Sequence, residues 1–213
     1  MELHIIIILL ILLTGASVHL YLRHQAQAAA PFRGSGGEPA GSKTHGILIP
    51  TELLQKIYAT ADHLFRATSA DRVLLLYALN GHTNSRRATC VFEMHKHIDG
   101  DTNLRSYGAV LKYIDIEIDD HYRKLLHDIE ANGSALFCTA YEKPSLLRDI
   151  YQQEGVQCAE ICHIARHAVD DKNDILLYLS VATHTADIFI PTERLTIRLA
   201  VQKIRQEAKK IIP

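Results

Sequence analysis

The sequence RVLLLYAL at residues 72–79 decides the fold class of this chain. After Arg72 its side chains are apolar at odd and even positions alike, so both faces of an extended segment would be apolar. A short run of this kind is typical of a central strand that is covered on both sides. Residues 88–95 (ATCVFEMH) follow a polar loop and are expected to form the return strand of a hairpin.

Helical patterns stand at both ends of the domain. Residues 50–68 are expected to form a first helix capped by Thr51, and a last helix should begin near Thr192 and run to the end of the chain. Their apolar stripes are Leu53, Leu54, Ile57, Ala61, Leu64 and Phe65 in the first helix, and Ile197, Val201, Ile204, Ala208 and Ile211 in the last. Each stripe predicts a face that must be covered.

The middle of the chain alternates between strands and helices. Residues 108–113 are expected to be extended, and residues 113–119 to form a half-buried strand, because isoleucines alternate there with acidic residues. An amphipathic helix should follow Asp119 or Asp120 as its cap and end at Asn132-Gly133. The remaining expected elements are a strand over 134–141, a helix over 145–154 stopped by Gly155, and strands over 156–169 and 175–183.

This order predicts an α/β chain of the α+β type. The hairpins imply a mainly antiparallel central sheet, and the apolar stripes require helices on both of its faces. We expect one soluble domain at residues 48–213, which is long enough to bury one core.

The N-terminus predicts a single-pass membrane anchor at residues 1–24. Residues 5–22 (IIIILLILLTGASVHLYL) contain no Lys, Arg, Asp or Glu and are nearly long enough to span a bilayer as a helix. No Lys or Arg precedes them, whereas Arg23, Arg33 and Lys43 follow, which places the soluble domain in the cytoplasm. The alternative is a signal peptide cleaved near Ala26-Gln27-Ala28, which would export the domain.

Residues 25–47 are expected to form a flexible linker. Residues 31–46 (PFRGSGGEPAGSKTHG) contain Gly and Pro in a proportion that cannot bury a core. The domain could then lie beside the membrane without docking to it.

Charge and cysteine content narrow the function classes. The formal net charge is −1, which offers no general attraction for nucleic acid. The four cysteines, Cys90, Cys138, Cys158 and Cys162, lack CxxC spacing and are expected to be buried, reduced thiols. If the domain is exported, a disulfide between two of them is the alternative.

Four phrases in this order resemble the GAF domain family. They are ADRVLLLYALNG (70–81), DDHYRKLLHDIEANGSALFCTAY (119–141), QQEGVQCAEICHIA (152–165) and DDKNDILLYLSVATH (170–184). PAS and roadblock-like domains share the broad layout. The resemblance implies a sensory or interaction module that binds a small molecule between the sheet and the inner helices and forms a homodimer through its terminal helices, although some relatives bind nothing.

The resemblance also implies a ligand pocket on the sheet face away from the terminal helices. The expected ligand-binding residues are Phe92, Met94, Phe137, Cys138, Glu160 and Cys162. The cysteine contexts of bilin-binding and methionine-sulfoxide-reducing relatives are missing from the sequence, so no cofactor and no catalytic residue is carried over.

Metal and catalytic motifs are weak. Cys158, Glu160 and Cys162 would share one face of a strand, and His95 and His97 form an HxH pair, but ordinary packing is the preferred interpretation of both. GxGxxG, GxxxxGK and GxSxG do not occur. We therefore expect a non-enzymatic membrane sensor acting on a separate effector protein, with a docking protein or a metal- or thiol-dependent enzyme as alternatives.

Overall fold

Six strands form one antiparallel sheet in the order β3-β2-β1-β6-β5-β4. The central strand β1 (Arg72–Gly81) pairs along its whole length with β6 (Asn173–Thr183). They are flanked by β2 (Asn84–His95) and β5 (Cys158–Ala168), and the short strands β3 (Ile116–Glu117) and β4 (Ser134–Cys138) form the edges. The computed structural model describes residues 49–81, 84–96, 109–168 and 173–211.

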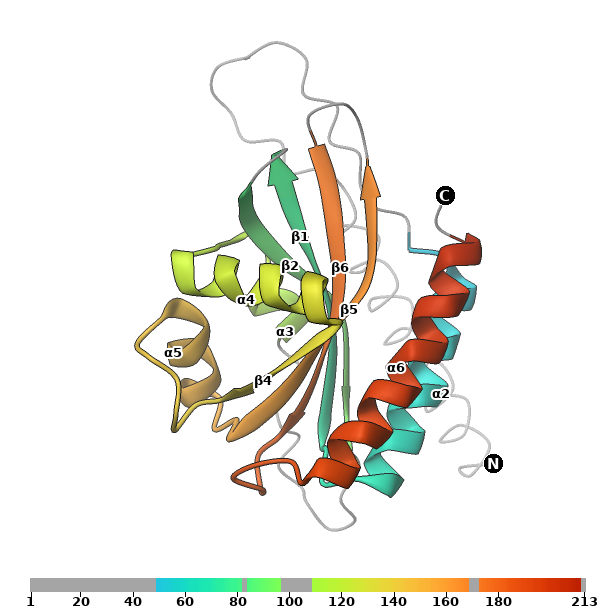
Figure 1. Ribbon diagram of the computed structural model, residues 1–213, viewed down its shortest axis with the longest axis vertical. Coiled ribbons are helices and arrows are strands. Elements are labelled where there is room, and N and C mark those ends of the chain that lie inside the picture. The colour runs from blue at the N-terminus through green and yellow to red at the C-terminus, as the bar shows by residue number, and fades with distance from the viewer. Residues whose placement is uncertain (1–48, 82–83, 97–108, 169–172, 212–213) are drawn as a thin grey trace, which may run out of the picture. The chain divides into compact units, whose positions relative to one another are not determined.

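Helices cover both faces of this sheet (Figure 1). The helices α2 (Thr51–Ala67) and α6 (Pro191–Ile211) lie side by side on one face, here called the terminal-helix face. The helices α3 (Ala109–Lys112), α4 (Asp120–Asn132) and α5 (Leu146–Gln153) cover the opposite, inner-helix face. The predicted antiparallel α+β architecture is thus confirmed.

The two faces carry separate hydrophobic cores, and β1 contributes to both. Val73 and Leu75 pack with α2 and α6, whereas Leu74 and Leu76 pack with the inner helices. The alternation of a strand sends successive side chains to opposite faces, which explains why RVLLLYAL has no polar face.

Local signals start and stop most helices as predicted. The Asp119 carboxylate accepts a hydrogen bond from the backbone N–H of Tyr122 (2.7 Å) and so caps α4. Its other oxygen accepts from the backbone N–H of Leu146 (2.7 Å), which joins the start of α5 to the start of α4. Gly133 ends α4 with φ +83°, the left-handed conformation that favours glycine.

Four local predictions were wrong. Residues 109–112 form a helix instead of an extended segment, and Thr51 makes no capping bond because Pro50 occupies the cap position. The strand predicted at 113–119 shrinks to two residues because Asp115 adopts φ +58°, which breaks the extended run. The strand β4 ends at Cys138, where backbone N–H groups of a turn bond to the Cys138 carbonyl.

The predicted anchor and linker at residues 1–47 fall outside the described residues. Among the described residues, no helix combines the length and apolar character needed to cross a bilayer.

Glu160 of β5 fastens α6 to the sheet. Its carboxylate is fully buried and accepts hydrogen bonds from Arg194 Nε (2.9 Å), Arg198 Nε (2.7 Å) and Ser134 Oγ (2.8 Å). The two bonds from arginines are charge-assisted, so the negative charge of the buried carboxylate is neutralised inside the protein.

We predict that Glu160→Gln destabilises the fold by about 2 kcal/mol, less than a fully buried pair would because both arginines are partly exposed. Urea unfolding followed by circular dichroism measures the change. Asp62→Asn, which removes the exposed partner of Arg66 on α2 and lies outside the groove between α2 and α6, is the control and should leave the midpoint unchanged. Equal midpoints for both variants would refute a fastening role for Glu160.

We also predict that Gly133→Ala lowers stability by about 2 kcal/mol and Gly155→Ala by about 1 kcal/mol. Both glycines have positive φ, but only at Gly133 would the added Cβ meet Arg205, at 3.3 Å. The Arg205 guanidinium bonds to the carbonyls of Gly133 (3.0 Å) and His163 (2.7 Å), so displacing it disturbs the contact between α6 and β5. The same urea titration compares the two, and a larger loss for Gly155→Ala would contradict this explanation.

Candidate functional site

Arg72 is the centre of a buried polar cluster on the inner-helix face. It is the first residue of β1, and its side chain is only 2% exposed. Its Nη1 donates to Glu154 Oε2 at 2.5 Å, and its guanidinium carbon lies 5.5 Å from the centre of the Tyr151 ring. A buried arginine needs such compensation because desolvation disfavours its charge.

Unsatisfied polar atoms gather in this cluster. Of the six buried side-chain nitrogen and oxygen atoms without a hydrogen-bond partner in the described part of the chain, three belong here: Nε and Nη2 of Arg72 and the hydroxyl of Tyr113. Burial raises the pKa of Tyr113 above its ordinary value, and Glu154 adds to the shift, so the hydroxyl stays protonated and can donate. Such atoms are rare in folded proteins, and each one calls for an explanation.

Hydrogen bonds of tyrosine hydroxyls attach the inner helices to the sheet on the face where Arg72 lies. Tyr122 of α4 and Tyr178 of β6 share a hydrogen bond of 2.5 Å, and Tyr151 of α5 bonds to Ser180 of β6 at 2.7 Å. Burial raises the pKa of Tyr151 and of both paired tyrosines. These bonds fix α4 and α5 against the central strand β6, so the cluster lies on a rigid support.

The six predicted ligand-binding residues do not share one face. Phe137 lies on the inner-helix face, where its ring meets Tyr151 edge-on at 5.5 Å. The other five are on the terminal-helix face: Cys138 and Cys162 in its core, Phe92 and Met94 packed against that core, and Glu160 bonded to α6. The expectation that all six lie away from the terminal helices was therefore wrong.

For the residues of β2, a bulge in its pairing with β1 explains this error. Leu75 pairs with Phe92 but Leu76 pairs with Cys90, so β2 skips Val91 in a bulge. Cys90, before the bulge, belongs to the inner-helix core, whereas Phe92, after it, faces the terminal helices. Sequence reasoning also missed Arg72; the only signal was one charged residue at the start of an otherwise apolar strand.

The cysteines correct a second expectation. Cys138 and Cys158, opposite each other on β4 and β5, form a disulfide, so these two are not reduced thiols. Cys90 and Cys162 are free and buried, as predicted. Burial raises the pKa of Cys90 to about 12, and burial next to Glu160 raises that of Cys162 as well, so neither is a ready nucleophile.

The metal interpretations find no support in the described ranges. No cluster of three or more His, Cys, Asp or Glu side chains suited to a metal ion occurs there. Cys158, Glu160 and Cys162 do share one face, but Cys158 is in the disulfide and Glu160 is bound by arginines. His95 bonds to Glu93 at 2.8 Å, and His97 lies outside the described residues.

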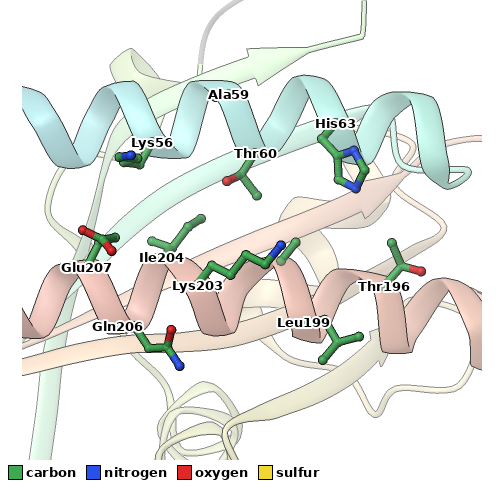
Figure 2. A pocket seen from close by; sticks show the side chains of 11 residues that line it. Lys56, Ala59, Thr60, His63, Thr196, Leu199, Lys203, Ile204, Gln206 and Glu207 are labelled. Atoms are coloured by element: carbon green, nitrogen blue, oxygen red, sulfur yellow. The ribbon is translucent and has the colours of Figure 1, made fainter.

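Two hollows lie next to α2. A groove of about 670 Å³ runs between α2 and α6, lined by Lys56, Ala59, Thr60, His63, Thr196, Leu199, Ala200, Lys203, Ile204, Gln206 and Glu207 (Figure 2). A second hollow of about 480 Å³ lies between α2 and β2, and Phe92 and Met94 belong to its lining. Both are on or beside the terminal-helix face.

Comparison with known proteins shows the fold and no closer relationship. No protein-family profile and no curated protein matches the sequence. Solved structures do match: a far-red cyanobacteriochrome photoreceptor has 11% identity over 74% of this chain and 86% of its own, with a TM-score of 0.52. A GAF domain/HD domain protein from Geobacter sulfurreducens has 11% identity over 75% of this chain and 94% of its own (TM-score 0.49), and the phycocyanobilin-bound GAF domain of a cyanobacterial phytochrome has 13% over 77% and 96% (TM-score 0.43). The described part of this chain has a GAF-like fold.

Proposed function

We propose that this protein is a membrane-tethered, non-enzymatic sensory module that receives a small ligand on the inner-helix face and signals through the groove between α2 and α6. The observation that carries the proposal is this groove, because it leaves part of the two terminal helices open to a partner. On α6, Leu195 and Leu199 are 57% and 52% exposed, and Leu199 lines the groove. Exposed apolar side chains grouped on a hollowed surface are typical of an interaction site.

The chemistry of the groove favours a second copy of this chain as its occupant. Lys56 and Lys203 supply positive charge and Glu207 supplies negative charge along a surface whose other residues are uncharged or histidine. A surface that carries both signs can pair with itself across a twofold axis, since Glu207 of each copy could then face one of the two lysines of the other. A separate effector protein would then bind the resulting dimer and pass the signal on.

The sensory part of the proposal has independent support. The far-red cyanobacteriochrome, which shares this fold, is a photoreceptor. The polar cluster at Arg72 provides unsatisfied hydrogen-bonding groups on the face opposite the groove. Of the six residues expected from the sequence to bind a ligand, Phe137 lies beside this cluster and is the one we retain.

A non-enzymatic role is favoured over thiol chemistry by the state of the cysteines. A thiol must ionise to attack, and the pKa of Cys90, about 12, keeps it protonated at neutral pH.

The two signals for the side of the membrane disagree. Arg23, Arg33 and Lys43 favour the cytoplasm, whereas a disulfide between Cys138 and Cys158 favours an oxidising compartment. We give the disulfide more weight, because it needs an oxidising environment to persist, while flanking charges only bias orientation. We therefore propose that residues 5–22 remain as the tether and that the domain lies on the oxidising side.

We predict that the protein extracted from membranes, alkylated under denaturing and non-reducing conditions, gains two alkyl groups and keeps its first 24 residues. Reduction before alkylation should raise the number to four, the cysteine content of the chain. Intact mass spectrometry measures both properties. Four alkyl groups without reduction would place the domain in the cytoplasm, and a mass lacking the apolar segment would show a cleaved signal.

We predict that Leu199→Asp weakens dimerisation at least about tenfold, because a charge would be buried against the partner's groove. Size-exclusion chromatography with light scattering, on the full chain in detergent micelles over a range of concentrations, gives the dissociation constant. Tyr141→Asp is the matched control, since Tyr141 is 76% exposed and is not a residue of the groove. A wild-type chain that stays monomeric would reject the second copy and favour the docking-protein alternative, in which another protein occupies the same groove.

A further inference from the structure

We propose that Arg72 binds an oxyanion, the carboxylate or phosphate group of a small ligand, on the inner-helix face of the domain. The inference rests on the proposed sensory function, for which it names the ligand chemistry. Its evidence is separate from the groove between α2 and α6.

The shape of the guanidinium group identifies the ligand. The Nε–H and the adjacent Nη2–H of an arginine point in parallel along one edge, and this pair matches the two oxygens of a carboxylate or phosphate. In Arg72 these are the two nitrogens without a partner, while Nη1 is occupied by Glu154. A side chain 2% exposed therefore presents an unused bidentate edge inside the protein.

The neighbouring groups leave that edge available. Tyr151 contacts the face of the guanidinium through its ring, which does not use the edge. The Tyr113 hydroxyl lies near Arg72 and near Glu154, whose hydrogen bonding and charge both raise the pKa of Tyr113. If Glu154 turned away, this hydroxyl would be free to donate to a ligand. Two parallel N–H donors and one O–H donor suit an acceptor with several oxygens better than a ligand with one carbonyl.

The charges near Arg72 explain how an anion can enter. Glu93 interacts with Arg72 electrostatically, but its carboxylate already accepts from the backbone N–H of Ala109 (2.9 Å) and is bonded to His95. Glu154 is the direct competitor, and its side chain is 18% exposed. Because Glu154 can turn toward solvent and Arg72 cannot, an arriving oxyanion would replace Glu154 as the counter-charge.

This exchange would also carry a signal. Glu154 is the C-terminal cap residue of α5, and the start of α5 is joined through Asp119 to the start of α4. Release of Glu154 from Arg72 would therefore loosen one end of α5. Ligand binding and the position of the inner helices would be coupled through one side chain.

Nuclear magnetic resonance of the full chain in detergent micelles, labelled with nitrogen-15 arginine, tests the proposal. The Arg72 Nε–H resonance is assigned as the one that disappears in Arg72→Lys. Sodium acetate and inorganic phosphate are the carboxylate and phosphate probes, and acetamide is the neutral control. We expect a saturable shift of this resonance with acetate, phosphate or both, and none with acetamide; the stronger probe identifies the class of ligand.

Three variants keep the result interpretable. Glu154→Gln removes the competing charge at constant size and should tighten anion binding about tenfold, whereas Tyr113→Phe should weaken it several-fold. Arg66→Lys, on the exposed surface of α2, should leave the Arg72 response unchanged. The proposal is overturned if the Arg72 resonance ignores both anions in wild type and in Glu154→Gln, because water alone would then satisfy the edge. If the dimer were intact, such a result would remove the anion site and leave the proposed dimer standing. Anion binding by a monomeric chain would instead reject the second copy as occupant of the groove and leave the anion site standing.

Discussion

The antiparallel pairing of β1 with β6 is the constraint on which the rest of the structure depends. It joins residues 72–81 to residues 173–182, so nearly the whole domain must fold before its centre is complete. Both strands are apolar on both faces, which makes two covering layers obligatory. The terminal helices and the inner helices are the two layers that meet this requirement.

The two layers differ in their chemistry. On the terminal-helix face, Glu160 is satisfied by Arg194, Arg198 and Ser134, so the charge is structural and fully compensated. On the inner-helix face, Arg72 is compensated in charge by Glu154 but keeps unpaired donors. A buried group that is neutralised yet not fully hydrogen-bonded is the kind of departure from good packing that functional sites show.

Covalent and polar links tie the elements that surround this cluster. The disulfide joins edge strand β4 to β5 and closes a loop of 20 residues that contains α5, with Tyr151 and Glu154 at its end. Asp119 bonds to backbone groups of both α4 and α5. The neighbourhood of Arg72 is thus held by several independent contacts, while Glu154, its counter-charge, is 18% exposed.

Local sequence patterns by themselves determined the element order, the antiparallel sheet and most helix ends. They could do so because the apolar spacing of a helix, the cap at Asp119 and the left-handed turn at Gly133 depend on neighbours within a few residues. The same reasoning missed α3 and the break at Asp115, where tertiary contacts override the alternating pattern.

Only the tertiary structure decided which residues meet. The face taken by Phe92 depends on a bulge against β1, and the bond between Cys138 and Cys158 depends on the register of β4 against β5. The burial of Arg72 depends on α5, which lies about eighty residues later in the chain. Strand register and layer packing are set by contacts between distant segments, and a single sequence carries no local signal for such contacts.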